Sequence, residues 1–275
     1  MNYSPLLTVM VRAARKAGAL AVQFFDRRHQ LEVAFKGKDD PVTSADTAVE
    51  KEILFHLRKA YPRYGILAEE SPPSTGKEEW QWVVDPIDGT LNFLHGNPHF
   101  ALSIGLARGD ELQAGVVYDP VRDELFTAER GRGAFLNDQR IRVSDRGTLN
   151  GALIATGFPL RRKHLAAPYL SSFAAVFAAS ADIRRAGSAS LDLAYTAAGR
   201  FDGFWESGLS PWDIAAGCII VQEAGGFCSD FQGGNQFLGS GNIVAGNPNL
   251  HRHLLTTLEG SELPQALGQS GTGPG

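Results

Sequence analysis

The stretch WVVDPIDGTLNF, residues 82–93, carries a run of large apolar residues directly into two aspartates three positions apart, and then into glycine and threonine. The apolar run predicts a buried strand, and its end delivers the carboxylates of Asp85 and Asp88 to one point. Pro86 fixes one backbone angle between them, and Gly89 allows a tight turn that exposes backbone N–H groups. If a helix begins at that turn, its amides favour an anion such as a phosphate group.

Short apolar runs around this stretch indicate the fold class. Between residues 80 and 136 the runs are separated by turn-like clusters such as RGDE and DPVRD, which is typical of an antiparallel meander. Beyond about residue 150, strand-like runs such as GALIATG, DGFWE and NIVAG alternate with alanine-rich helical stretches. That alternation is expected of helices packed over a second sheet. We therefore predict a layered α+β architecture.

Two helices are predicted ahead of the stretch. Apolar residues recur at three- and four-residue steps across residues 7–24, which indicates a helix with one apolar stripe. The start of a second helix fits a capping box either at Thr43 with Asp46 or at Thr47 with Glu50. Both helices should lay one face on the core.

The chain is predicted to form two halves that share one continuous interface. We place the N-terminal half, with the antiparallel sheet and most candidate metal ligands, at residues 1–145 and the C-terminal half at residues 146–259. KGKDDP, residues 36–41, is predicted to be a polar loop. The tail, residues 260–275, is rich in Gly, Ser, Pro and Gln and poor in large apolar residues, which predicts disorder.

Charge and composition exclude several classes of partner. Lys and Arg total 26 against 30 for Asp and Glu, so the net charge of -4 gives no global attraction to nucleic acid or membrane phosphates.

Cys218 and Cys228 lack a CxxC spacing and are predicted to be core thiols. His251 and His253 are predicted to be surface residues. The first apolar segment contains arginine and lysine, which argues against a signal peptide or membrane span and predicts a cytoplasmic location.

Crowded carboxylates predict a cation site. They repel each other and raise one another's pKa unless a divalent cation neutralises them, and oxygen ligands without histidine suit Mg²⁺. DPIDGT alone also fits a polar turn after a strand, so the hypothesis needs further acids. Glu69 and Glu70 follow the apolar run YGILA, although a solvated acidic loop fits this segment equally well. Asp213, three residues after Ser210, fits either a ligand or, as the local sequence favours, a capping box.

Four separated motifs match a known family. Asp39 to Asp46 (DDPVTSAD), Ala68 to Ser71 (AEES), Asp85 to Thr90 (DPIDGT) and Trp212 with Asp213 resemble, in order and spacing, the motifs of the inositol monophosphatase family. The resemblance extends to about residue 258, and GSASLDLAYTAAGRFDGFWE and QEAGG are similar to its bacterial SuhB-like members. It implies an αβαβα sandwich and a Mg²⁺-dependent hydrolysis of inositol 1-phosphate and related polyol or sugar phosphates by a metal-activated water. One departure is Ala68, which replaces the usual glycine.

The resemblance also implies two to three Mg²⁺ ions. Glu69, Asp85 and the Ile87 carbonyl would bind the first ion, and Asp85, Asp88 and Asp213 the second. Glu69 would also hold a weaker third ion. Lithium inhibition would follow if Li⁺ occupies the site that contains Asp213.

Catalytic and substrate-binding roles come from the same resemblance. Thr90, oriented by Asp46, and Glu69 would position and deprotonate the attacking water. The Gly89 and Thr90 amides would receive the phosphate. The implied substrate contacts are Asp88, Gly89, Thr90, Gly187, Ser188, Ala189, Glu206 and Asp213.

Two alternatives remain open. Related phosphatases cleave fructose 1,6-bisphosphate, histidinol phosphate or adenosine 3',5'-bisphosphate, and selectivity among such substrates depends on a few loop contacts. SuhB-like members also imply a link to the RNA polymerase antitermination machinery, so the chain could act chiefly as an interaction protein. The resemblance further implies a homodimer, with the arginines near residue 184 as candidate interface residues.

Overall fold

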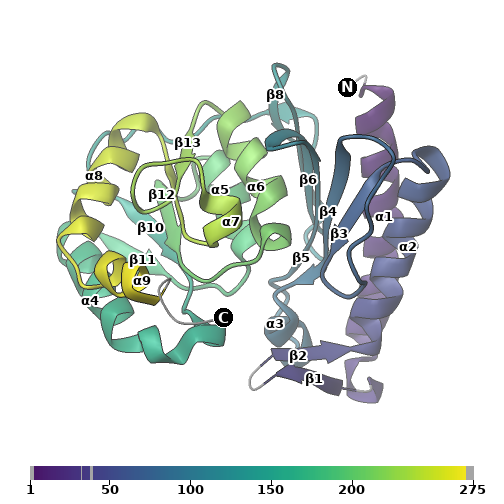
Figure 1. Ribbon diagram of the computed structural model, residues 1–275, viewed down its shortest axis with the longest axis horizontal. Helices are drawn as coiled ribbons and strands as arrows, with labels where there is room; N and C mark the ends of the chain where they lie inside the picture. Colours follow the sequence, from purple (N-terminus) through teal and green to yellow (C-terminus); the bar gives the residue numbers. More distant parts are fainter. Residues whose placement is uncertain (1–2, 32, 38–39, 271–275) are drawn as a thin grey trace.

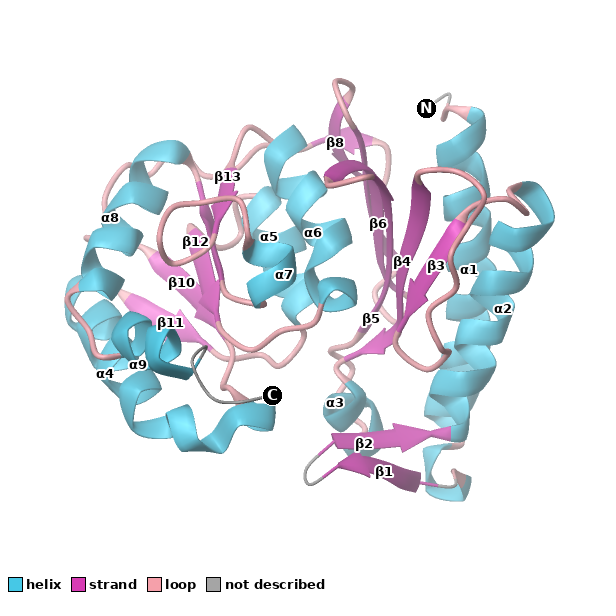
Figure 2. Ribbon diagram, viewed as in Figure 1, coloured by secondary structure: helices cyan, strands magenta, loops and turns pink. Residues whose placement is uncertain are grey.

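Five alternating layers of helices and sheets build the protein, as the computed structural model of residues 3–31, 33–37 and 40–270 shows (Figure 1 and Figure 2). One outer layer holds α1 (Pro5–Asp26) and α2 (Ser44–Ala60), the middle layer holds α5 (Ala189–Ala197) and α6 (Pro211–Glu223), and the other outer layer holds α4 (Ala166–Ala179), α8 (Pro248–Glu259) and α9 (Leu263–Ser270). The two sheets separate these layers. The predicted layered αβαβα sandwich is confirmed.

The first sheet contains the predicted meander. Its strands lie in chain order, β3 beside β4 in parallel and every later neighbour antiparallel. Antiparallel neighbours need only short turns, which is why the turn clusters were readable from the sequence. The strands are β3 (Gly65–Ala68), β4 (Trp80–Asp88), β5 (Ala101–Arg108), β6 (Glu111–Asp119), β7 (Glu124–Glu129), β8 (Gly133–Leu136) and β9 (Gln139–Arg140).

The second sheet is mixed, with strand order β11-β10-β12-β14-β13. Strand β10 pairs in parallel with both β11 and β12, whereas β14 pairs antiparallel with β12 and β13. The helices predicted to cover this sheet are present on both of its faces (Figure 1). Its strands are β10 (Leu153–Thr156), β11 (Asp182–Arg184), β12 (Gly203–Glu206), β13 (Phe227–Ser229) and β14 (Ile243–Gly246).

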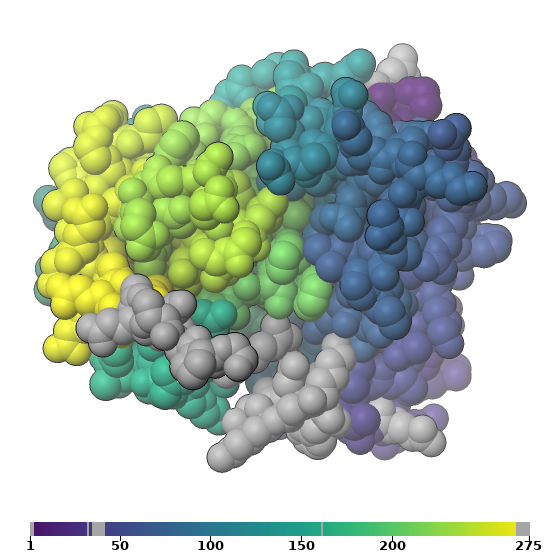
Figure 3. All heavy atoms as spheres, in the orientation of Figure 1, coloured from purple at the N-terminus to yellow at the C-terminus, as the bar shows by residue number. Residues whose placement is uncertain are grey.

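One apolar cluster joins the two halves of the chain. It contains Val83 and Phe126 from the first sheet, Phe204 and Ala245 from the second, and Ile214 from α6 between them. Figure 3 shows the blue N-terminal half in continuous contact with the green and yellow C-terminal half on this face. The proposed boundary at residue 145 falls between β9 and β10, and its status as a domain boundary stays a prediction.

Two predictions of irregular structure are wrong. KGKDDP, predicted as a loop, overlaps a hairpin of β1 (Val33–Gly37) and β2 (Asp40–Thr43). Part of the tail at residues 260–275, predicted to be disordered, forms α9. Its Leu263 side chain is fully buried against α4 and α8. Residues 271–275 of that tail, and Asp39 of the DDPVTSAD motif, lie outside the described residues.

Smaller features complete the fold. Cys218 on α6 and Cys228 on β13 are buried and free, as predicted for core thiols. Within the described ranges, every helix is too short or too polar to cross a bilayer. The short helical segments are η1 (Arg28–Gln30), α3 (Thr90–His95), η2 (Leu160–Leu165) and α7 (Phe237–Ser240).

His251 contradicts its predicted surface position. It lies on α8 with only 4% of its surface exposed, and its Nε2 atom is 2.8 Å from the Ser229 hydroxyl. His253, two residues further along, is exposed as predicted. Burial lowers the pKa of His251 from 6.5 to about 4, because the charged imidazolium would lose its hydration.

This shift predicts a pH-dependent stability. Between about pH 6.5 and 4 the unfolded state binds a proton that the folded state does not, so the free energy of unfolding decreases as the pH falls through this window, by roughly 1–3 kcal/mol. Urea denaturation from pH 7.5 to 4.5 should show this decrease reduced in His251→Gln. The control His253→Gln should follow the wild-type curve, and an unchanged slope in His251→Gln would contradict the assignment.

Candidate metal centre

A bulge in β4 turns two carboxylates toward the same side of the sheet. Side chains three positions apart on a regular strand face opposite sides. Here Asp85 pairs with Ser103 and Asp88 with Ala101, so the segment between the aspartates holds one residue more than the opposing strand. An extra residue resets the alternation, and Pro86 is tolerated because a bulge needs no ladder hydrogen bond there. Both carboxylates therefore point toward the middle helix layer.

Helix α6 brings the third carboxylate to this point. The helix packs closely on the sheet, since a Cβ atom built on Gly115 of β6 would lie 2.6 Å from the Ala216 carbonyl oxygen. One carboxylate oxygen from each of Asp85, Asp88 and Asp213 lies within 4.8 Å of the others, and all three residues are buried. Asp213 Oδ2 also accepts the Ser210 N–H at 2.7 Å. The capping role favoured by the local sequence and the place in the acidic cluster therefore coexist.

The electrostatics of this cluster fit a divalent cation. Burial raises the pKa of Asp85 well above its usual value, and the charges of Glu69, Asp88 and Asp213 raise it further. Burial likewise raises the pKa of Asp88. Neutralisation of crowded carboxylates is the ordinary role of a bound Mg²⁺ or similar ion, which prefers such oxygen ligands. Buried acids without a counter-charge would be costly, so the donor set suits a metal.

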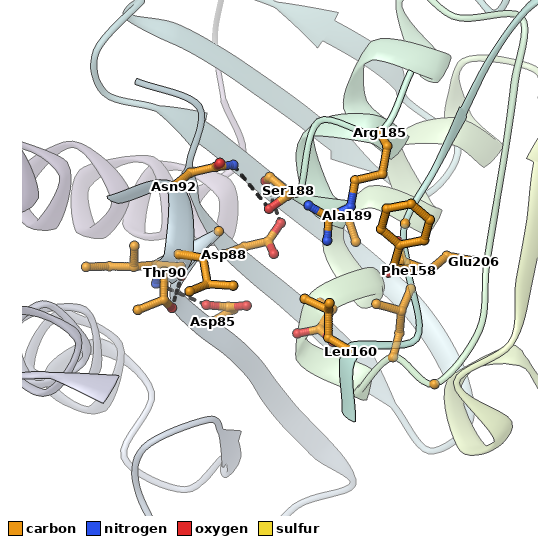
Figure 4. Close-up of a pocket in the computed structure, with 18 of the residues that line it drawn as sticks. Asp85, Asp88, Thr90, Asn92, Phe158, Leu160, Arg185, Ser188, Ala189 and Glu206 are labelled. Carbon is orange, nitrogen blue, oxygen red and sulfur yellow. Dashed lines mark hydrogen bonds between the residues drawn. The ribbon is translucent and has the colours of Figure 1, made fainter. Parts of the chain in front are cut away.

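The C-terminal half holds Asp88 in place. Its Oδ2 atom accepts hydrogen bonds from the Ser188 hydroxyl at 2.6 Å and from the Ser190 N–H and hydroxyl at 2.7 and 2.6 Å. Asn92 on α3 lies beside Ser188 (Figure 4) and adds a second link. Its Nδ2 group donates to the Ala186 carbonyl at 2.9 Å and to the Gly187 carbonyl at 3.3 Å. Asp88 and Asn92 thus connect residues 186–190 to the 85–92 segment by hydrogen bonds.

Helix α2 positions two parts of the site. Thr43 caps it in the first of the two predicted ways, with Asp46 Oδ2 accepting the Thr43 N–H at 2.8 Å. The other oxygen of Asp46 lies 3.4 Å from the Thr90 hydroxyl. Burial raises the pKa of Asp46 to about 6. One turn later, Glu50 accepts the Glu70 N–H at 2.7 Å and the Ser71 hydroxyl, so it fixes the loop that carries Glu69.

Gly89 makes the turn after the two aspartates. Its φ of 99° lies in the left-handed region, and a Cβ atom there would be 3.0 Å from the His99 oxygen and 3.2 Å from the Gly187 oxygen. Glycine is therefore needed both for conformation and for space. Helix α3 begins directly afterwards at Thr90, so the condition that the sequence left open for this turn is met.

Eleven of the twelve predicted site residues line one cavity. Acids of the cluster lie at one end and Glu206 at the other (Figure 4). Asp46 is the exception, and it reaches the site through Thr90. The lining residues that were predicted are Glu69, Asp85, Ile87, Asp88, Gly89, Thr90, Gly187, Ser188, Ala189, Glu206 and Asp213.

Known proteins resemble the chain over almost its full length. The profile described as the inositol monophosphatase family matches residues 2–263. The chain belongs to the inositol monophosphatase family. Members include the Nus factor SuhB of Pseudomonas aeruginosa, 51% identical over 96% of this chain and 98% of the relative, and the inositol-1-monophosphatase of Mesorhizobium japonicum, 48% identical over 94% and 98%.

A solved member confirms the architecture. The crystal structure of the extragenic suppressor protein SuhB from Bartonella henselae has a TM-score of 0.91 and 48% identity, and the match covers 94% of this chain and 99% of that one. The family motifs AEES, DPIDGT and WD meet at the cavity in our structure. Ala68, the departure from the family glycine, is buried at the end of β3.

Some residues of this family site were missed by sequence reasoning. A role for Glu50 near the site could have been predicted from the sequence, since it lies four residues after Asp46 on the same helix face. The roles of Ser190 and Asn92 could not be predicted from a single sequence, because their partners are about 100 residues away in the chain. Phe158, Leu160 and Arg185 also line the cavity.

We predict that Gly89→Ala is far more damaging than Gly109→Ala. Gly109 also has a positive φ, 55°, but a Cβ atom there meets no atom within 4 Å among the residues that the structure describes. It should lose only about 1 kcal/mol from backbone strain, whereas Gly89→Ala adds close contacts and should lose roughly 2–4 kcal/mol. Urea unfolding of both variants measures the difference, and equal losses would refute the role of the close approach.

Glu50→Ala should weaken metal binding without touching a metal ligand. Loss of both hydrogen bonds frees the loop of Glu69, and such supporting changes cost about tenfold or more in affinity. Calorimetric titration with Mg²⁺ provides the measurement. Glu52→Ala is the matched control on the same helix, because the Glu52 carboxylate lies 3.0 Å from the His56 ring rather than on the loop of Glu69. Equal affinities in the two variants would show that Glu50 does not support the site.

Proposed function

We propose that the protein is a Mg²⁺-dependent phosphomonoesterase that hydrolyses inositol 1-phosphate and related polyol or sugar phosphates. The observation that supports this most strongly is the buried cluster of Asp85, Asp88 and Asp213 at one end of a cavity. Family membership supports phosphatase chemistry, and the Mesorhizobium relative is named for this substrate. Glu206 at the far end of the cavity suits a substrate that carries hydroxyl groups.

In this proposal Glu69, Asp85 and the Ile87 carbonyl would hold one Mg²⁺. Asp85, Asp88 and Asp213 would hold a second, and Glu69 would also hold a third. The ions supply a lowered pKa for the attacking water and charge stabilisation for the leaving oxygen. The residues around the ions would position the attacking water and the substrate.

Thr90 and Asp46 orient the attacking water. The Thr90 hydroxyl has a single proton, which it can donate to Asp46 at 3.4 Å or to the Ile87 carbonyl at 3.1 Å. When the hydroxyl donates to Asp46, its oxygen can accept a hydrogen bond from the water. Burial raises the pKa of Asp46 to about 6, which suits a group that receives a proton through Thr90.

The substrate would be held at both ends. Backbone N–H groups of Gly89 and Thr90 would bind the phosphate, which is supported by the tight turn at Gly89. At the other end, Glu206 would accept hydrogen bonds from substrate hydroxyls. Gly187, Ser188 and Ala189 line the wall between the two, so alignment of the ester bond would come from the 186–190 segment.

The proposal predicts release of inorganic phosphate from inositol 1-phosphate only when Mg²⁺ is present, with inhibition by Li⁺. Asp88→Asn should lower kcat by about a hundredfold or more, and Asp110→Asn, in the exposed turn after β5, should not. A parallel assay with fructose 1,6-bisphosphate, histidinol phosphate and adenosine 3',5'-bisphosphate ranks the alternatives. Faster turnover of one of these three would overturn the substrate assignment, and no release from any ester would overturn the function.

A second role in transcription antitermination is favoured by one finding. The Pseudomonas relative is named a Nus factor. If this chain binds the RNA polymerase antitermination machinery, an Asp88→Asn protein without hydrolysis should still support ribosomal RNA transcription. Failure of that variant, with wild type active in the same assay, would count against a role independent of catalysis.

We also propose a homodimer in which α4 of one copy contacts its partner. The fourteen residues of α4 include no charged side chain, although Leu170 and Phe177 are each 56% exposed. An uncharged apolar face meets its symmetry mate without like-charge repulsion, as a two-fold interface requires. Of the arginines near residue 184 that were candidate interface residues, Arg184 lies on the next strand, β11, and pairs with Asp182.

The dimer is tested by sedimentation or light scattering. Leu170→Glu should shift the protein to monomer because it places two carboxylates in the symmetric contact. Phe55→Glu, at an equally exposed aromatic residue of α2 (59% exposed), should leave the dimer intact. A monomeric wild type, or a dimer that survives Leu170→Glu, would contradict this surface.

A further inference from the structure

Glu206 lies in a space that exists because residue 157 has no side chain. A Cβ atom built on Gly157 would be 2.1 Å from the Glu206 Cδ atom and 2.1 and 2.2 Å from its two carboxylate oxygens. The carboxylate therefore rests directly against the Gly157 backbone. No real Cβ atom approaches a heavy atom this closely, so any other residue at 157 would have to displace Glu206.

The sheet register explains this contact. Strands β10 and β12 are parallel and pair Ile154 with Gly203 and Thr156 with Trp205. One step beyond the last pair, Gly157 and Glu206 are neighbours at the carboxyl ends of the two strands, so their side chains project to the same face. The carboxyl ends of parallel strands are the usual place for ligand binding in sheets of this kind.

Conformation does not require glycine here. Gly157 is absent from the set of glycines with positive φ, so alanine fits the backbone. The atoms that a methyl group would meet are the far end of a flexible side chain, so the protein should fold with Glu206 rotated away. Glycine is thus needed at residue 157 only so that the Glu206 carboxylate can occupy its present position.

We propose that Gly157 is a specificity-determining position, whose missing side chain lets Glu206 face the cavity and bind the hydroxyl groups of a polyol phosphate. This inference rests on the proposed function and adds a residue to its substrate site. Gly157 is a positioning residue, since it acts only through Glu206. Both residues line the cavity that holds the acidic cluster at its other end.

The position of Glu206 is further constrained by its surroundings. It is only 9% exposed, and burial raises its pKa well above the usual value, with the charges of Asp192, Asp213 and Asp88 acting in the same direction. The acidic side chains on the other walls disfavour alternative positions of the Glu206 carboxylate close to the bound substrate. A displaced Glu206 should therefore lose its contacts with substrate rather than find equivalent ones.

The test compares wild type, Gly157→Ala, Glu206→Ala and the double variant. For inositol 1-phosphate, Gly157→Ala should raise KM about tenfold or more, the usual effect of losing hydrogen bonds to a charged group. The Ki of inorganic phosphate as a competitive inhibitor should stay the same, because phosphate binds only at the acidic end. KM for phenyl phosphate, which carries no hydroxyl groups for Glu206 to bind, should also stay the same. The double variant should match Glu206→Ala, since Gly157 acts only through that side chain.

Two further measurements keep the inference separate from the proposed function. Gly147→Ala is the control, because the nearest atom of the described residues to a Cβ there would be Asn249 Cβ at an ordinary 3.7 Å, and it should behave as wild type. A crystal structure of Gly157→Ala should show Glu206 moved. An unmoved Glu206, an unchanged KM, or a double variant clearly worse than Glu206→Ala would overturn the inference, whichever ester proves to be the best substrate.

Discussion

Mutual repulsion among three buried carboxylates is the constraint on which the site depends. The fold forces Asp85 and Asp88 onto one side of β4 by means of a bulge, and α6 delivers Asp213 to the same point. Without a counter-charge this arrangement would cost stability, because burial and like charges both penalise ionised carboxylates. Such a cluster has the charge and the oxygen ligands that suit a cation.

Both halves of the chain are needed to hold that cluster. Asp88 comes from the first sheet, but Ser188 and Ser190 from the second half hold its oxygen. Asn92 binds carbonyls of the same segment, and Gly89 approaches it closely enough to exclude a side chain. The continuous apolar core between the sheets sets these distances. The cavity is therefore a product of how the two sheets dock, and neither half contains it alone.

Much of the fold and the outline of the site were predictable from the sequence. Period-two apolar runs and short turn clusters identify the meander, because neighbouring antiparallel strands are local in the chain. The acidic motifs could be assembled because their order matches a family. Residue-level geometry was less accessible: the bulge at Pro86 leaves no hydrophobic signature, and KGKDDP looks polar although it overlaps a hairpin. Burial of His251 and Leu263 depends on partners from distant segments, as does the contact between Gly157 and Glu206.

The most direct test of the metal centre is anomalous diffraction from crystals soaked in Mn²⁺, which replaces Mg²⁺ and can be located without bias. We predict anomalous peaks within about 2.0–2.6 Å of carboxylate oxygens of Asp85, Asp88 and Asp213, with at least one peak also close to Glu69. These peaks should weaken when Mg²⁺ is added in excess. Crystals in which the three carboxylates bind no cation at millimolar Mn²⁺ would contradict the assignment of this cluster as a metal centre.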